Sequence, residues 1–121
     1  MQRFRSASVG RGRTRVHADV YRVGEDLLVV LGGEGPHIGA VSMAESIGEG
    51  EPRVTTLVAP PHKEAELTEH ASRAICASTG RRTVALAGIH LDDITRDEIE
   101  AIRRNVRELA RRLANGGSRD P

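Results

Sequence analysis

The chain has 121 residues, of which 38% are hydrophobic, 29% are charged and only 2% are aromatic, and its formal net charge is +1. These values are typical of one globular domain with an aliphatic core, and they argue against nucleic-acid binding, which needs excess positive charge or aromatic stacking surfaces. There is no apolar run near the ~20 residues of a membrane span and no signal-peptide hydrophobic region, so we expect a cytoplasmic protein with no membrane partner. The chain has one cysteine, Cys76, so we expect no internal disulfide.

Apolar and polar residues alternate along the first half of the chain, as they do in half-buried strands. The predicted strands are residues 3–9, 14–23, 27–31, 37–45 and 53–59. The third is a continuous apolar run from Leu27 to Leu31, and it therefore predicts a central strand buried on both faces. We interpret the basic run at 11–15, between the first two strands, as a solvated hairpin tip rather than a binding patch.

Apolar residues with helical spacing occur in the second half of the chain. A helix is predicted at about 63–78, closed by Gly80, and is followed by a strand at 83–89. Thr95 and Glu98 form the capping-box pattern that opens a second helix with a clear apolar stripe. The stripe consists of Ile99, Ile102, Val106, Leu109 and Leu113.

The element order βββββ-α-β-α predicts an α+β fold, with a mostly antiparallel six-stranded sheet and two helices packed on one face. We assign residues 1–115 to a single domain and residues 116–121 to a flexible C-terminal tail. Neither an internal repeat nor a linker divides the chain.

Three histidines, His37, His62 and His90, each lie where a predicted strand meets a loop rich in Gly, Pro or Asp. A short loop joins strands 37–45 and 53–59, which predicts an antiparallel hairpin with His37 and His62 at one end. The fifth strand, the first helix and the sixth strand form a β-α-β unit whose strands run in the same direction, which brings His90 to that end as well. The topology therefore predicts that all three histidines meet at one end of the sheet.

This end of the sheet collects groups that suit a phosphate-bearing ligand. Gly33 and Gly35 allow backbone N–H groups to approach an anion closely, and the N-terminus of the first helix carries partial positive charge. Lys63 adds a full positive charge, the histidines can donate or accept hydrogen bonds, and Asp92 is one of several nearby carboxylates.

Other interpretations of the same residues stay open. The glycines can belong to an ordinary hairpin loop, and the acids can lie in solvent. Three histidines can also hold zinc, but no close His-x-His spacing is present, so we predict no metal site. A histidine base would need a nucleophile, and Ser42 qualifies only if its face of the strand points to the site, so we assign no catalytic residue.

Three motifs give the chain a family resemblance: GPHIGAVS at 35–42, PHKE at 61–64 and AGIHLD at 87–92. Together with residues 94–109 they resemble the prenylated flavin chaperone LpdD-like family, over about residues 14–113. The resemblance implies a fold similar to proteasome assembly chaperones, a homodimer, and a non-catalytic role in binding prenylated FMN, or FMN, for a UbiD-like decarboxylase.

The resemblance also implies the residues of a cofactor site. Its motif histidines correspond to His37, His62 and His90, with Lys63 as the phosphate partner. With Gly33, Gly35 and Asp92 from the residue analysis, they make up the expected cofactor site. Because aromatic residues are scarce, we expect apolar side chains such as Ile38, Ile89 and Leu91, or a dimer partner, to cover the flavin ring. The alternatives are a small histidine-based enzyme, with or without a metal, and a flavin-independent protein assembly factor.

Overall fold

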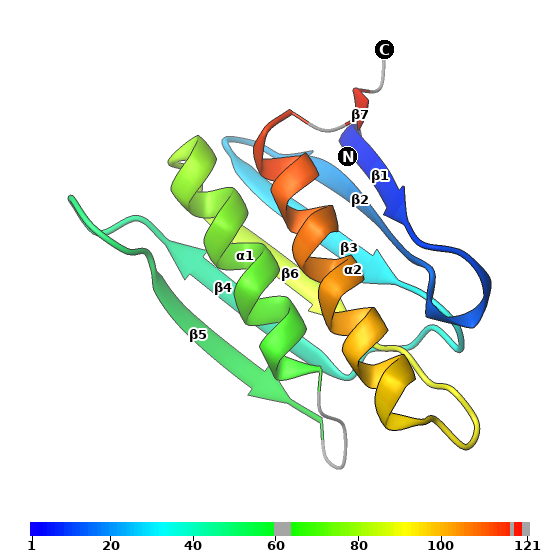
Figure 1. Ribbon diagram of the computed structural model, residues 1–121. Coiled ribbons are helices and arrows are strands. Elements are labelled where there is room, and N and C mark those ends of the chain that lie inside the picture. The colour runs from blue at the N-terminus through cyan, green and yellow to red at the C-terminus, as the bar shows by residue number, and fades with distance from the viewer. Residues whose placement is uncertain (60–63, 117, 120–121) are drawn as a thin grey trace.

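The computed structural model describes residues 1–59, 64–116 and 118–119, and shows one curved sheet with two helices side by side on the same face (Figure 1). The strands are β1 (Gln2–Val9), β2 (Val16–Val23), β3 (Asp26–Gly32), β4 (Ala40–Glu45), β5 (Arg53–Val58), β6 (Thr83–Ala87) and β7 (Ser118–Arg119). The helices are η1 (Gly12–Thr14, a single 3-10 turn), α1 (Ala65–Thr79) and α2 (Arg96–Ala114). The predicted α+β fold is confirmed, and β7 adds a two-residue strand beside β1.

The strand order is β5-β4-β6-β3-β2-β1-β7. All neighbouring strands are antiparallel except β3 and β6, which are parallel. Strand β4 lies between β5 and β6 and is antiparallel to both, so β5 and β6 run in the same direction, as the β-α-β argument predicted. The carboxyl ends of β3, β5 and β6 therefore lie at one end of the sheet, together with the start of β4.

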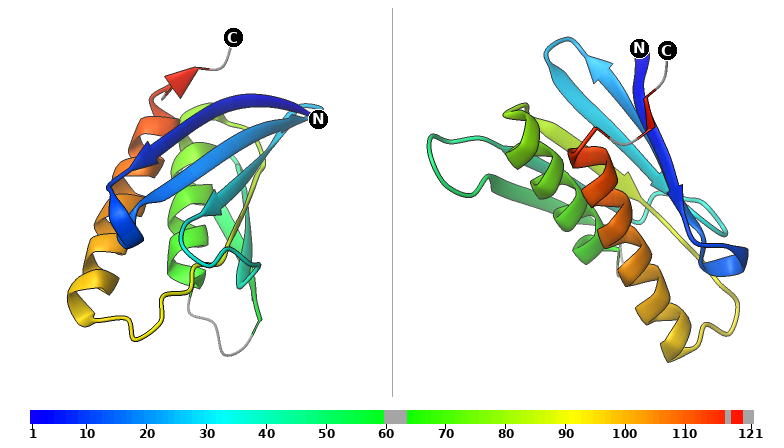
Figure 2. Two further views of the ribbon diagram at one scale, coloured as in Figure 1. Left: turned by 90° about the vertical axis from the view of Figure 1, so that its right-hand side faces the viewer. Right: turned by 45° about the horizontal axis from the view of Figure 1, so that its top comes forward.

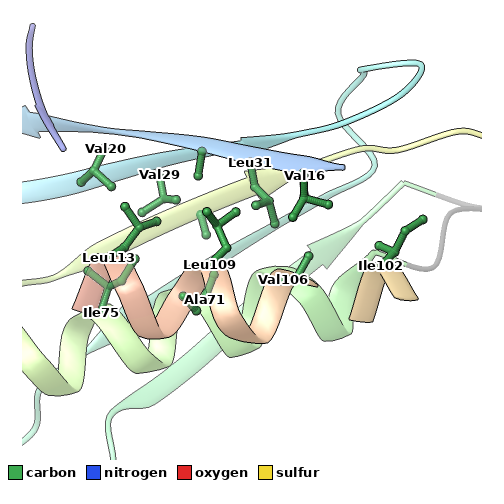
Figure 3. Close-up of a cluster of buried hydrophobic side chains, with 14 of the residues drawn as sticks. Val16, Val20, Val29, Leu31, Ala71, Ile75, Ile102, Val106, Leu109 and Leu113 are labelled. Atoms are coloured by element: carbon green, nitrogen blue, oxygen red, sulfur yellow. The ribbon is translucent and has the colours of Figure 1, made fainter. Parts of the chain in front are cut away.

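The hydrophobic core fills the space between the sheet and the two helices (Figure 3). The sheet contributes alternate residues of its strands, such as Val20 and Val29, and α1 contributes Ile75. Helix α2 buries Ile102, Val106, Leu109 and Leu113, which confirms most of the predicted stripe. Ile99 is the exception, with 38% of its surface exposed, because it lies in the first turn of α2, beyond the end of the sheet.

The opposite face of the sheet carries no helix in the part of the chain that the structure describes, as the two turned views show (Figure 2). In β3, Leu27, Val29 and Leu31 are buried, whereas Leu28 and Val30 are only half-buried. The prediction that β3 is buried on both faces is therefore wrong. Both helices pack on one face, so alternate residues of this apolar run point away from them.

Local capping signals fix the ends of both helices. Thr95 Oγ1 accepts a hydrogen bond from Glu98 N at 3.1 Å, and Glu98 Oε1 accepts one from Thr95 N at 3.0 Å, which confirms the capping box. Gly80 ends α1 in the left-handed conformation, with φ of 71°.

The basic turn at 11–15 was predicted to be a solvated hairpin tip. Arg13 in this turn instead donates a hydrogen bond to Glu98 Oε2 at 2.7 Å, so the turn is docked on the start of α2. Among the described helices, none is both long and apolar enough to span a membrane.

Candidate functional site

Two long loops meet at the end of the sheet where the histidines were expected: the β3–β4 loop (33–39) and the β6–α2 loop (88–95). Backbone hydrogen bonds join them directly. The donor–acceptor pairs are His37 N to Gly88 O (3.3 Å), Gly39 N to Ala87 O (2.8 Å) and His90 N to Glu34 O (2.9 Å). The structure thus brings the segments of His37 and His90 together, whereas His62 and Lys63 lie outside the described residues. We call these two loops, together with Glu64, the loop cluster.

Glycines allow the two loops to come this close. A Cβ atom on Gly88 would lie 2.1 Å from the carbonyl oxygen of His37. Gly35 has a φ of 55°, and a Cβ there would lie 2.7 Å from the carbonyl oxygen of His90. A Cβ on Gly33 would lie 3.1 Å from the carbonyl oxygen of Arg15. In this structure the space that these glycines leave is therefore filled by protein backbone.

The His37 side chain points inward and is held by its own loop and by Glu64. It lies in the loop before β4 rather than in the strand predicted at 37–45. Its Nδ1 donates to Gly35 O at 2.9 Å, and its Nε2 lies 3.5 Å from Glu64 Oε1. Only 28% of its side chain is exposed, so its orientation is fixed by these contacts rather than by solvent.

Glu64 is the residue of this site that the sequence analysis did not assign. Only 8% of its surface is exposed, and it occupies the N-cap position of α1 without capping the helix through its side chain. Instead Oε1 accepts a hydrogen bond from Ile89 N at 3.3 Å, while Oε2 is buried without a hydrogen-bond partner among the described residues. Two signals in the sequence could have found it: Glu64 is the last residue of the PHKE motif, and it is a carboxylate at the predicted start of a helix.

His90 points outward. Its Nε2 lies 3.0 Å from Asp92 Oδ1, and both side chains are exposed. The carbonyl oxygen of Asp92 accepts a hydrogen bond from Arg13 Nη2 at 2.7 Å, which ties this loop to the β1–β2 turn. Asp93 completes the turn with a positive φ of 51°. The His90–Asp92 pair is therefore a surface pair on a braced loop.

The described part of the loop cluster is acidic. It contains Glu34, Glu64, Asp92 and Asp93 against the histidines His37 and His90. The carboxylate of Glu64 lies at the N-terminus of α1, where we expected a phosphate. A buried acid there favours ligand groups that donate hydrogen bonds and disfavours an anion at the same point.

The alternative enzyme readings gain no support from the described residues. Ser42 is fully buried and faces α1, where its Oγ lies 2.8 Å from Thr56 Oγ1 and 2.7 Å from Thr68 Oγ1, so it offers no accessible nucleophile. No group of three or more His, Cys, Asp or Glu side chains within residues 1–59, 64–116 and 118–119 is placed to hold a metal ion.

The apolar residues expected to cover a flavin differ in how much of their surface is exposed. Ile38 has 61% of its surface exposed, whereas Ile89 is half-buried against the core. Leu91 is only 5% exposed and belongs to the core itself, so the prediction that it covers a ligand is wrong. Its position after β6 places it between the sheet and α2 rather than at the surface of the loop.

A shallow groove of about 480 Å³ lies elsewhere, on β1 and β2. It is lined by Ser6, Ala7, Ser8, Arg15, His17, Ala18 and Asp19. The ring of His17 lies over Gly32, where a Cβ would approach it to 2.9 Å. The groove is polar and separate from the loop cluster.

Comparison with known proteins finds a matching family and solved structures of similar fold. A family described as the prenylated flavin chaperone LpdD-like domain matches residues 10–117. A chain from the solved structure titled "Crystal Structure of a Novel Chaperone Complex for Yeast 20S Proteasome Assembly" is similar in fold, with a TM-score of 0.63 at 10% identity over 93% of this chain and 94% of that chain. A search of curated proteins finds no match. Because the family match spans most of the chain, this protein belongs to the prenylated flavin chaperone LpdD-like family.

Proposed function

We propose that this protein is a non-catalytic, cytoplasmic chaperone that binds prenylated FMN, or FMN, and serves a UbiD-like decarboxylase as a cofactor carrier or maturation factor. The observation that carries the proposal is the family match over residues 10–117. The loop cluster supports it, because two loops from distant parts of the chain are held rigidly together there by three backbone hydrogen bonds.

The residues of the cluster divide the binding task. Ile38 is exposed and would contact the ring system, and His37 beside it would hydrogen-bond the polar edge of that ring. Lys63 and His62, which lie outside the described residues, would hold the phosphate. The cofactor supplies its reactive ring to the decarboxylase, and this chain only binds, orients and releases it.

Anaerobic titration of the purified protein with FMN and prenylated FMN tests the proposal. We expect saturable binding that His37→Ala and Lys63→Ala each weaken at least about tenfold, which corresponds to roughly one lost hydrogen bond to a charged group. His70→Ala, a histidine on α1 outside the loop cluster, is the matched control and should bind like the wild type. No binding of either flavin, or an equal loss in the control, contradicts the proposal.

A flavin-independent assembly factor is the second candidate. The observation that favours it is the exposed apolar surface formed by Ile38 and Val58, whose segments are joined by the hydrogen bond from Ala59 N to Gly39 O at 2.9 Å. Such a surface beside a rigid loop suits protein docking. Under this function, a variant with His37, His62 and His90 all changed to alanine would still bind the decarboxylase with unchanged affinity.

A further inference from the structure

The shallow groove of about 480 Å³ on β1 and β2 has no part in the proposed function. Strand pairing sets Ser8 opposite His17 and Ser6 opposite Asp19. These four side chains point to the face of the sheet that carries no described helix, because the residues between them belong to the core face. Arg15, just before β2, completes the polar lining. Polar side chains from two strands therefore surround one hollow.

A glycine on the neighbouring strand keeps the groove open. Register pairs His17 with Ser8 on one side and with Gly32 of β3 on the other. The ring of His17 lies over Gly32, where a Cβ atom would approach the ring Cε1 to 2.9 Å. A side chain at this position would compete with the ring for the same space. The glycine thus lets the ring lie toward β3, and Ser8 on the other side stays exposed.

The protein itself leaves most hydrogen-bonding groups of the groove unused. Within the part of the chain that the structure describes, the polar lining side chains other than Asp19 take part in no hydrogen bond or ion pair; these are Ser6, Ser8, Arg15 and His17. Arg13, two positions before Arg15, shows the contrast, because its guanidinium binds a carboxylate of α2 at 2.7 Å. Hydroxyls, an imidazole and a guanidinium with its fork of N–H donors therefore line the hollow and can still bind a ligand.

The two ends of the groove differ in charge. Arg15 and Asp19 are four positions apart on an extended segment, so their backbones are about 13 Å apart. Ser8 and His17 add hydrogen-bonding groups near the Arg15 end. At the other end the Asp19 carboxylate lies 3.6 Å from Arg3 Nη1, so its charge is only partly offset. An anionic group is therefore favoured at the first end and a hydrogen-bond donor at the second.

We propose that the groove binds a phosphorylated sugar or polyol, with the phosphate at the Arg15 end and a hydroxyl group donating to Asp19. The terminal oxygens of a phosphate can be shared among the guanidinium fork, the Ser8 hydroxyl and the His17 ring. A carboxylate would be satisfied by the guanidinium alone and would leave the other donors unused. The volume lies within the range of small-molecule sites, about 300–1,000 Å³. Because the groove is shallow and open to solvent, binding should be modest, with a dissociation constant of about 0.1–1 mM.

Titration of the isotope-labelled full chain with ribose 5-phosphate, followed by NMR, tests the proposal. We expect saturable shifts of the backbone amides of Ser8 and His17 at up to about 10 mM ligand, and weaker binding of ribose and of inorganic phosphate, which each offer only part of the recognised chemistry. Arg15→Ala should raise the dissociation constant about tenfold or more, because it removes a charge-assisted hydrogen bond. Arg11→Ala removes the same charge from the same turn outside the groove, and this matched control should stay within about twofold of the wild type. Both arginines are exposed, so both variants should keep the circular dichroism of the folded wild type.

A double-mutant cycle tests how the groove is kept open. Gly32→Ala should weaken binding about tenfold, because the new Cβ displaces the His17 ring toward the groove. In a His17→Ala background the same change should have almost no further effect, since no ring is left to displace. Equal effects of Gly32→Ala in the two backgrounds would overturn the role given to the glycine.

FMN carries a polyol phosphate as its side chain and is the second probe, which identifies the source of this chemistry. An FMN affinity that falls in Arg15→Ala assigns the groove to the cofactor, and an unchanged FMN affinity assigns it to a smaller phosphorylated sugar or polyol. No shift of the groove amides with either probe, or shifts that persist with equal affinity in Arg15→Ala, overturns the proposal. Inorganic phosphate that binds as tightly as ribose 5-phosphate overturns the sugar or polyol part. The inference does not depend on flavin binding at the loop cluster, because no residue of that cluster lines the groove.

Discussion

Replacing Gly88 by alanine perturbs the loop cluster at the point where its two loops are closest. The new Cβ would lie 2.1 Å from the His37 carbonyl oxygen and 2.5 Å from the carbonyl carbon, whereas ordinary contacts begin near 3.4 Å. The β3–β4 loop must therefore move by more than an ångström. That movement breaks the bond from His37 N to Gly88 O and strains the one from Gly39 N to Ala87 O. Overpacking of about 1–3 kcal/mol and about 1 kcal/mol for the lost bond predict a total near 3 kcal/mol.

Urea unfolding followed by circular dichroism measures this change directly. A loss of about 3 kcal/mol corresponds to a fall in Tm of roughly 12 °C for a domain of this size. Gly33→Ala is the matched control, because its Cβ would lie 3.1 Å from Arg15 O and 3.4 Å from the Ile89 side chain, and a shift of a few tenths of an ångström relieves both contacts. It should cost less than about 1 kcal/mol. Equal stability of the two variants would refute the reasoning, since it would mean that the approach of Gly88 to His37 does not hold the loops.

Two further predictions concern groups on and under α1. Ser42→Ala removes two hydrogen bonds beneath α1, but Thr56 stays bonded to Glu69 and Thr68 stays bonded to Ala65 O. The free energy of unfolding should therefore fall by about 1–2 kcal/mol, and the flavin affinity should stay unchanged. A loss of flavin binding without a loss of stability would contradict this. Burial, and then the nearby arginine charges, lower the pKa of His70 in the folded protein. As the pH falls below about 6.5, the imidazole therefore binds a proton in the unfolded chain before it does so in the folded protein. The folded state loses stability over this pH range. His70→Gln should therefore show a smaller difference in Tm between about pH 7.5 and about pH 5 than the wild type, and an unchanged difference would show that His70 does not contribute.

The fold was predictable because its signals are local. Alternation of apolar residues marked the strands, and the Thr95–Glu98 capping box marked the start of α2 to the residue. Chain direction then followed from connectivity alone: a hairpin followed by a β-α-β unit forces the loops of His37 and His90 to one end of the sheet. None of these steps needed knowledge of a side-chain contact.

Burial on the two faces of the sheet was not predictable in the same way. The run Leu27–Leu31 has the composition of a strand buried on both faces, yet only alternate residues of β3 contact the helices. Sequence shows that Leu28 and Val30 are apolar but not whether a helix of the same chain covers them. Likewise, the ion pairs of Glu45 with Arg53 and Arg82, and of Arg82 with Asp26, depend on the strand order β5-β4-β6-β3.

The meeting of the His37 and His90 loops was predictable, whereas the side-chain contacts of these loops were not. Sequence identified His37 and His90 as loop histidines, but it did not show that one points inward to Glu64 and the other outward to Asp92. Leu91 was expected to cover a flavin because aromatic residues are scarce, but its side chain belongs to the core. Side-chain direction in a loop depends on the groups packed around it, and Glu64, which holds His37, belongs to another segment of the chain.

The contacts within the loop cluster constrain how any cofactor could bind there. The backbone N–H groups of His37, Gly39, Ile89 and His90 already donate to protein acceptors, so they are not available to grip a phosphate. The described loops present outward the apolar side chains of Ile38 and Ile94, the His90–Asp92 pair, and the carboxylates of Glu34 and Asp93. A ligand held by such groups stays at the surface and loses little on release. That suits a carrier that must give its cofactor to another protein, whereas an enzyme would enclose its cofactor to exclude water.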